Sequence, residues 1–171
     1  MESLKAKIRD IPDFPKPGIV FKDITPLLAD GASFRRMTET LAGRFADRKV
    51  DLVVGIEARG FVIGSAVAYV LGAGIVLIRK KGKLPYKTHK AIYQLEYGTD
   101  TLEIHEDAIK PGQRVLIVDD LLATGGTVSA AIDLVNKLGG TVVGIGFLVE
   151  LTFLRGRERL RGQEVFSLVQ F

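Results

Sequence analysis

Two adjacent carboxylates follow a buried apolar run in the segment VLIVDDLLATGGT, residues 115–127. After Asp119 and Asp120 comes a turn of small residues with two threonines, and a helical pattern then begins. Open α/β sheets bind ligands at the carboxyl ends of their strands, where glycines let backbone N–H groups approach a phosphate and a helix start adds a positive dipole. Two acids at such a place are costly unless sugar hydroxyls or a metal pair with them. The segment therefore predicts a phosphate site with sugar hydroxyls or a metal beside it.

The alternative interpretation of this segment is a glycine-containing strand-to-helix turn with solvated aspartates. The spacing GxxxxGK[ST] of a P-loop is absent, and so is the dinucleotide fingerprint GxGxxG. A pair of aspartates followed by ATGGT at a strand end is much rarer than a generic glycine-rich turn. The combination therefore favours the functional interpretation.

A second candidate is the basic segment RKKGKLPYKTHK, residues 79–90. It holds six of the 24 Lys and Arg residues and no acid, so the formal net charge of +4 is concentrated locally. Such a segment suits an anionic small ligand, a nucleic acid or simply a solvated loop. Its one aromatic residue is Tyr86, which gives little support for stacking on nucleic-acid bases. We expect neither a nucleic-acid partner nor a membrane partner.

The composition excludes several classes of protein. A chain of 171 residues is long enough for one domain with a buried core. The absence of cysteine excludes disulfides and Cys-ligated zinc or iron–sulfur sites, and it fits a cytoplasmic location. Residues 1–10 are charged throughout and lack the apolar stretch of a secretory signal. The uncharged stretch 61–78 reaches the lower length limit of a membrane span, but Gly72 and Gly74 divide it into a helix pattern and a strand pattern.

The candidate residues require a scaffold, and the hydrophobic pattern predicts one. Continuously apolar runs are typical of parallel strands covered on both faces, and they occur at 52–56, 75–78, 114–118 and 142–149. Helical stripes occur at 33–48, with Ser33 as the expected N-cap, at 61–71 and at 127–138. A last strand is expected near the C-terminus. Alternating strands and helices predict an α/β domain with right-handed crossovers.

Two regions break this alternation. Residues 14–28, FPKPGIVFKDITPLL, contain too many prolines for an ordinary helix and are too apolar for a simple solvated loop. Residues 80–105 begin basic and continue as AIYQLEYGTDTLEIH, which predicts two short antiparallel strands around residues 98–100. Long connections in compact domains are usually functional or mobile.

The segment VLIVDDLLATGGT resembles the phosphoribosyl-pyrophosphate signature of the type I phosphoribosyltransferases. The resemblance extends along the whole chain, because FPKPGIVFKDITPLL, GIEARGF, RKKGKLP, LEYGTDTLEIH and VELTFLRGRERL match the adenine-specific branch of that family in order and at similar spacing. It implies the type I phosphoribosyltransferase fold: a mostly parallel central sheet flanked by helices, with a small hood and a flexible loop. Residues 1–171 would form a single domain, and residues 1–30 would form much of the hood.

The resemblance also implies an activity. Adenine and phosphoribosyl pyrophosphate would give AMP and pyrophosphate in purine salvage, with Mg²⁺ carried by the pyrophosphate rather than by a protein metal site. Members of the family are typically homodimers, and we expect the same here.

The resemblance assigns roles to named residues. The 5-phosphate would be held by Ala123, Thr124, Gly125, Gly126 and Thr127, and the ribose hydroxyls would face Asp119 and Asp120. A pyrophosphate loop would include Glu57, Ala58 and Arg59, with a non-proline cis peptide near Glu57–Ala58. In the hood, Val20 would read the adenine edge through its main chain and Phe21 would stack on the ring.

Three further residues would do the chemistry. Arg79 and Lys83 would contact the pyrophosphate from a mobile loop and stabilise its developing charge. Glu96 would be the general acid/base, because adenine must lose a ring proton as its nitrogen attacks the anomeric carbon. Without the resemblance, the loop could equally be solvated and Glu96 an exposed strand carboxylate. The basic run RGRERLR, residues 155–161, is interpreted as a helical, solvated or interface face.

Alternatives from other classes remain open at this point. The same fold could act as a non-catalytic sensor of the sugar phosphate, although the chain has no room for an added DNA-binding module. It could bind nucleic acid through the basic loop. It could also be an enzyme for hypoxanthine, guanine or xanthine, which the hood around Val20 and Phe21 opposes.

Overall fold

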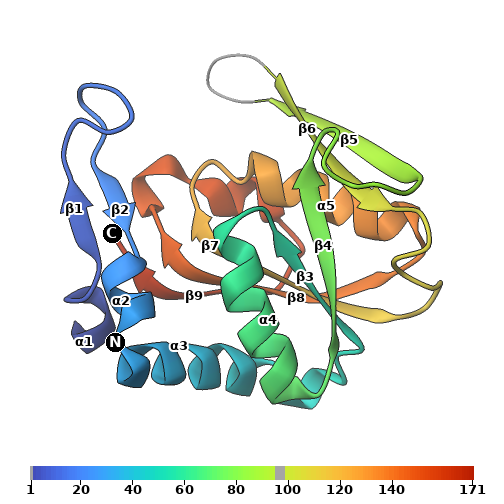
Figure 1. The fold of residues 1–171 in the computed structure, drawn as a ribbon, viewed down its shortest axis with the longest axis horizontal. Coiled ribbons are helices and arrows are strands. Elements are labelled where there is room, and N and C mark those ends of the chain that lie inside the picture. Colours follow the sequence, from blue (N-terminus) through green and yellow to red (C-terminus); the bar gives the residue numbers. More distant parts are fainter. Residues whose placement is uncertain (1, 95–98) are drawn as a thin grey trace.

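The computed structural model describes residues 2–94 and 99–171, which are built around a seven-stranded sheet with the order β5-β6-β4-β3-β7-β8-β9 (Figure 1). Five strands are parallel: β3 (Leu52–Ile56), β4 (Gly74–Lys80), β7 (Arg114–Leu122), β8 (Thr141–Glu150) and β9 (Val165–Gln170). The strands β5 (Thr88–Gln94) and β6 (Thr99–His105) form an antiparallel hairpin, and β6 joins the sheet at the edge of β4. The expected α/β fold with a mostly parallel sheet is confirmed.

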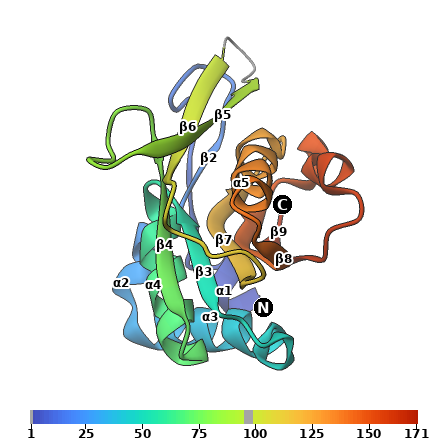
Figure 2. The ribbon, with the colours of Figure 1, turned by 90° about the vertical axis from the view of Figure 1, so that its right-hand side faces the viewer.

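Helices cover both faces of this sheet, as the continuous apolar runs predict. The helices α3 (Gly31–Arg44) and α4 (Arg59–Leu71) share a core with Val53 and Leu116. The helix α5 (Gly126–Lys137) shares a second core with Val54 and Ile117 (Figure 2). Since successive side chains of a strand point to opposite faces, β3 and residues 115–118 of β7 are continuously apolar and contribute to both cores.

Most element ends differ from the sequence prediction by a few residues, and the helix predicted at 33–48 ends at Arg44; two further differences, in β7 and at the start of α3, have a physical reason. The strand β7 continues through Asp119 and Asp120 to Leu122, so the carboxylates lie within the strand rather than after it. The helix α3 begins at Gly31 with Asp30 as its N-cap, and Asp30 Oδ1 accepts the backbone N–H of Ser33 at 2.8 Å. Ser33, the expected N-cap, therefore lies inside the first turn. The 3-10 helix η1 (Ala46–Arg48) follows α3 and precedes β3.

Residues 2–30 form a small antiparallel sheet with a short helix at each end. The strands β1 (Arg9–Ile11) and β2 (Phe21–Asp23) pair with each other, between the short helices α1 (Glu2–Lys5) and α2 (Thr25–Ala29). Leu4, Ile24 and Leu27 are buried in the core beside α3 and α4. We call residues 9–23 the hood. The hood loop and the β5–β6 hairpin project from the same end of the molecule (Figures 1 and 2).

Between β8 and β9 the chain forms two short 3-10 helices, η2 (Thr152–Leu154) and η3 (Gly156–Leu160). Helix α4 ends at Leu71, and Gly72 adopts the left-handed conformation expected of a helix stop. In the described parts of the chain, every helix is too short or too polar to span a bilayer.

Candidate active site

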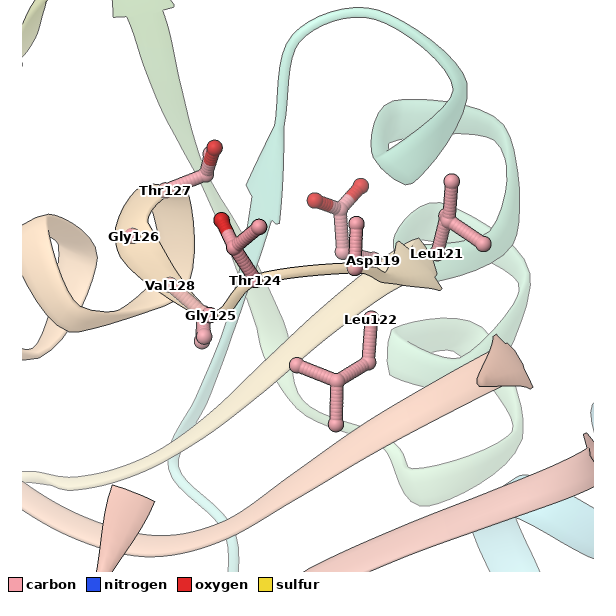
Figure 3. A pocket seen from close by; sticks show the side chains of 9 residues that line it. Asp119, Leu121, Leu122, Thr124, Gly125, Gly126, Thr127 and Val128 are labelled. Carbon is pink, nitrogen blue, oxygen red and sulfur yellow. The ribbon is translucent and has the colours of Figure 1, made fainter. Parts of the chain in front are cut away.

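The turn from β7 to α5 encloses a small cavity of about 70 Å³. Its lining residues are Asp119, Leu121, Leu122, Ala123, Thr124, Gly125, Gly126, Thr127 and Val128. Gly125 has φ +82°, a left-handed conformation that glycine adopts without strain. The hydroxyls of Thr124 and Thr127 and the carboxylate of Asp119 project to one side of the turn, whereas Leu122 points to the other (Figure 3). The turn thus presents hydroxyls and a helix N-terminus to one space, which suits an anion.

Asp119 and Asp120 are both buried, with 8% of each residue exposed. Burial, and then the charge of Asp120, raise the pKa of the Asp119 carboxyl well above its usual range. Asp120 Oδ2 instead accepts a hydrogen bond from Nε of Arg59. The pair therefore resists carrying two negative charges, and a ligand that supplies hydroxyl donors or a cation would relieve that repulsion.

Arg59 connects the end of β7 to the hood. Its guanidinium pairs with Asp120 and lies 5.1 Å from the ring centroid of Phe21. The next residue is glycine for a steric reason, because a Cβ at Gly60 would lie 2.6 Å from Asp119 Oδ1. The start of α4 can therefore approach the acid pair closely.

A cluster of charges lies at the end of β3. Glu57 Oε1 accepts a hydrogen bond from Nζ of Lys83 at 2.6 Å, and its carboxylate also accepts two bonds from Arg79 at 3.3 Å. The backbone N–H of Lys80 adds a bond of 3.0 Å. Burial raises the pKa of Glu57, but these donors outweigh it and hold the pKa at about 2. The peptide bond between Glu57 and Ala58 is cis, as the resemblance implied.

A larger and more apolar cavity of about 550 Å³ lies between the hood and the end of β8. It is lined by Asp10, Gly18, Ile19, Val20, Lys22, Leu151, Phe153, Leu154 and Phe171. Val20 belongs to this lining, whereas Phe21 packs edge-on against Phe14 at 5.2 Å and lies beneath Arg59. Val20 and Phe21, which were both predicted to contact the adenine ring, thus have different neighbours. Leu151, Phe153 and Leu154 were not singled out from the sequence.

Tyr93 is another residue that sequence reasoning missed. Its hydroxyl donates a hydrogen bond to Asp100 Oδ2 at 3.3 Å, and burial raises its pKa against the opposing influence of the nearby Thr127 side chain. Lys80 pairs with the same Asp100 at 3.3 Å. We call residues 123–127, between β7 and α5, the threonine–glycine turn. The strand β5 packs against α5, so Tyr93 connects the hairpin to this turn. The sequence signal that could have pointed to Tyr93 is its place in a predicted strand, three residues before the predicted general acid Glu96.

Comparison with known proteins agrees with this geometry. Residues 23–167 match the phosphoribosyl transferase domain family. The chain is 63% identical to the adenine phosphoribosyltransferase of Syntrophotalea carbinolica over the full length of both proteins. The chain belongs to the adenine phosphoribosyltransferase family.

Solved structures of adenine phosphoribosyltransferases share the fold. The crystal structure from Thermoanaerobacter pseudethanolicus superposes with a TM-score of 0.97 at 57% identity, covering 99% of each chain. The enzyme from Saccharomyces cerevisiae, complexed with an imino-altritol bisphosphate and adenine, gives a TM-score of 0.92 at 41% identity, covering 98% of this chain and 97% of that one.

Most of the predicted site residues of this phosphoribosyltransferase lie in three groups. Asp119, Asp120 and residues 123–127 lie together at the β7–α5 turn. Glu57, Arg79 and Lys83 form the charge cluster, and Arg59 joins the acid pair to the hood. Glu96 lies outside the described residues.

The arginines of the run at 155–161 are exposed, as interpreted, and residues 156–160 form the 3-10 helix η3. Arg157, whose side chain is 43% exposed, also pairs with Glu150, whose side chain is 5% exposed. The run thus combines a solvated face with one contact to the end of β8.

Proposed function

We propose that this phosphoribosyltransferase transfers the phosphoribosyl group of phosphoribosyl pyrophosphate to adenine, forming AMP and pyrophosphate in purine salvage. The observation that carries the proposal is the shared location of the acid pair and the threonine–glycine turn, in a chain 63% identical to an adenine phosphoribosyltransferase. The apolar cavity by the hood lies at the neighbouring strand β8.

The sugar phosphate would occupy the β7–α5 turn. Backbone N–H groups at the start of α5 and the hydroxyls of Thr124 and Thr127 would bind the 5-phosphate. Asp119 and Asp120 would accept hydrogen bonds from the ribose hydroxyls, which offsets the cost of burying both acids.

Magnesium fits this arrangement as a companion of the substrate. Mg²⁺ is usually bound by one or two carboxylates together with substrate phosphates and water. Asp119 and Asp120 supply carboxylates beside the expected position of the sugar. Bound there, the ion would neutralise pyrophosphate charge, while the protein's own side chains orient the sugar.

Pyrophosphate would be the leaving group, stabilised by Arg79 and Lys83. Both cations already face the end of β3 because Glu57 holds them there. Charge that develops on the pyrophosphate would draw on these preplaced cations as the bond to the anomeric carbon breaks. Glu57 would then share its cations with the pyrophosphate.

Adenine would enter from the hood. The main chain of Val20 and the wall formed with Leu151 supply one side of the base site, and the ring of Phe21 supplies an aromatic surface. The ring nitrogen of adenine would attack the anomeric carbon through an oxocarbenium-like transition state as the C–O bond to pyrophosphate breaks. Glu96 would take the ring proton.

A homodimer is part of this proposal. The helix α4 and the strand β4 expose large apolar side chains, Val62, Tyr69, Val70, Ile75 and Leu77, and Tyr69 is 88% exposed. Such a face is typical of a surface that a second protein covers. We further propose one domain over residues 1–171, a cytoplasmic location, and neither nucleic-acid nor membrane partners. Light scattering on the purified protein tests the dimer, and a monomer would contradict it.

The deciding experiment measures pyrophosphate release with phosphoribosyl pyrophosphate and Mg²⁺, offering adenine, hypoxanthine, guanine, xanthine and uracil separately. We expect turnover with adenine alone. Turnover with another base would retain the sugar-phosphate site and discard the assignment of Val20 and Phe21. Binding of phosphoribosyl pyrophosphate without turnover of any base would favour the sensor function.

A further inference from the structure

The segment between β8 and β9 packs against the back of the threonine–glycine turn. It contains the four arginines of the run RGRERLR, none of which has a part in the proposed reaction. Leu160, at the end of η3, is 2% exposed and belongs to the same core as Leu122 and Val128. The segment therefore packs against the side of the turn that faces this core.

The contact between the two segments is backbone against backbone. A Cβ at Gly125 would lie 2.6 Å from the carbonyl oxygen of Gly156. Conversely, a Cβ at Gly156 would lie 2.3 Å from the carbonyl oxygen of Ala123 and 2.8 Å from the side chain of Leu122. At each of these glycines the nearest atom is a backbone carbonyl oxygen of the other segment, so the position of Gly156 constrains the position of the turn.

Arg157, the residue after Gly156, fixes this segment to two strands. Its Nε and Nη2 donate to the two carboxylate oxygens of Glu150 at 2.8 and 2.7 Å. Its Nη1 donates to the carbonyl oxygen of Val165 at 3.0 Å, and Nη2 also lies 3.3 Å from Ser167 Oγ. A planar guanidinium can make this bidentate pair and reach the carbonyl at once, whereas an ammonium cannot reproduce the geometry.

Glu150 is a buried anion held by this arginine. Burial raises its pKa, but hydrogen bonds from Arg157 and Ser167 outweigh burial and lower the pKa below the usual value. The next residue, Leu151, donates its N–H to the carbonyl oxygen of Leu122 at 2.9 Å, which ties the end of β8 to the end of β7. The Arg157–Glu150 pair is thus connected to the turn by two routes.

We propose that Arg157 is a positioning residue for the sugar-phosphate site. By holding Gly156 against Ala123 and Gly125, it keeps the backbone of the turn in the conformation that binds the 5-phosphate. This inference rests on the proposed function of the turn. It assigns Arg157 no contact with substrate.

The experiment compares Arg157→Met, Arg157→Lys and Gly156→Ala with the wild type. Arg161→Met is the matched control, because Arg161 lies in the same run, is exposed and makes no hydrogen bond or ion pair with any described residue. For each protein we would measure kcat, KM for both substrates, ribose 5-phosphate binding by calorimetry, and thermal unfolding. Assays would run well below each unfolding temperature.

We expect Arg157→Met to raise KM for phosphoribosyl pyrophosphate and to weaken ribose 5-phosphate binding by about tenfold or more, since small misplacements of a site have effects of this size. KM for adenine should change far less, Arg157→Lys should recover only part of the loss, and Gly156→Ala should show the same selectivity. Equal effects on both substrates, or an unchanged affinity for the sugar phosphate in a folded Arg157→Met protein, would overturn the inference.

The design separates this inference from the proposed function. If Arg157→Met does not fold, Arg157→Lys and Gly156→Ala decide the matter by the same criteria. If the wild type binds ribose 5-phosphate without turnover, the proposed reaction fails while calorimetry still decides the role of Arg157. If the wild type does not bind ribose 5-phosphate, both ideas fail.

Discussion

The Nζ atom of Lys83 lies 2.6 Å from Oε1 of Glu57, a carboxylate at the end of β3 whose side chain is 9% exposed. Arg79 pairs with the same carboxylate. The two cations proposed for pyrophosphate are therefore oriented before substrate binds, and Glu57 is the anion that orients them.

This cluster predicts a pH dependence of stability. The pKa of Glu57 is about 2 in the folded protein, below its ordinary value of 4.5. Between these values the unfolded chain binds more protons, so the free energy of unfolding rises with pH across this window and the contribution is complete above it. Urea unfolding from pH 2 to 7 should show a flatter profile for Glu57→Gln than for the wild type. The exposed Glu106→Gln is the control, and identical profiles for Glu57→Gln and the wild type would refute the ion cluster.

The acid pair predicts a separation of activity from folding. Asp119→Asn with Asp120→Asn keeps the side-chain volumes but removes both negative charges and replaces one acceptor oxygen of each residue with an NH2 donor, which cannot accept from a ribose hydroxyl. We expect kcat/KM for phosphoribosyl pyrophosphate to fall by about 100-fold or more, in line with losses of preorganised polar groups, with unfolding still cooperative. Asp133→Asn, on an exposed face of α5, should remain near wild-type activity. Near-normal rates in the double variant would rule out the ribose assignment.

The hydrogen bond of Tyr93 predicts a smaller effect on phosphoribosyl pyrophosphate than that of the acid pair. Its hydroxyl donates to Asp100 and lies near Thr127, so Tyr93→Phe removes one hydrogen bond beside the proposed 5-phosphate site. One such bond is worth a factor of about five in affinity, and KM for phosphoribosyl pyrophosphate should rise by about that factor. Tyr86→Phe, in the exposed basic segment, is the control. A change in KM for adenine alone would contradict this role.

The parts of the fold and site that the sequence predicted are local in the chain. The strand β3 was predicted at its observed bounds, since residues buried on both faces leave an uninterrupted apolar run. The β7–α5 turn was predicted because its acids, glycines and threonines are contiguous. Asp30 and Ser33 are both good N-caps three residues apart, so the pattern alone could not choose between them.

The parts that could not be predicted depend on the arrangement of strands. Arg157 contacts Glu150 of β8 and Ser167 of β9 together because these strands are neighbours, and Tyr93 lies near Thr127 because the hairpin packs against α5. Leu151 faces the hood only because β8 follows β7 in the sheet. The spacing of residues along the chain does not predict these contacts, because they depend on the order of the strands in the sheet.

The proposed general acid/base predicts an effect on turnover. Glu96→Gln keeps the size of the side chain but removes the proton acceptor. We expect kcat with adenine to fall by about 100-fold, the usual scale of general acid–base catalysis, while KM for phosphoribosyl pyrophosphate stays close to the wild-type value. Glu106→Gln again serves as the control. Unchanged turnover would remove Glu96 from the mechanism.

The apolar cavity by the hood predicts an effect on the other substrate. Leu151 lines this cavity together with Val20, and Leu151→Ala would remove apolar contact from the proposed base site. The loss of this partly buried leucine contact corresponds to about a tenfold change, so KM for adenine should rise by about that factor while KM for phosphoribosyl pyrophosphate changes little. Ile92→Ala, at a residue 74% exposed on β5, is the control for a leucine-sized truncation. An equal rise in both KM values would mean that Leu151 acts through its N–H bond to Leu122 and the turn behind it, and the base would then have to lie on the Phe21 side of the hood.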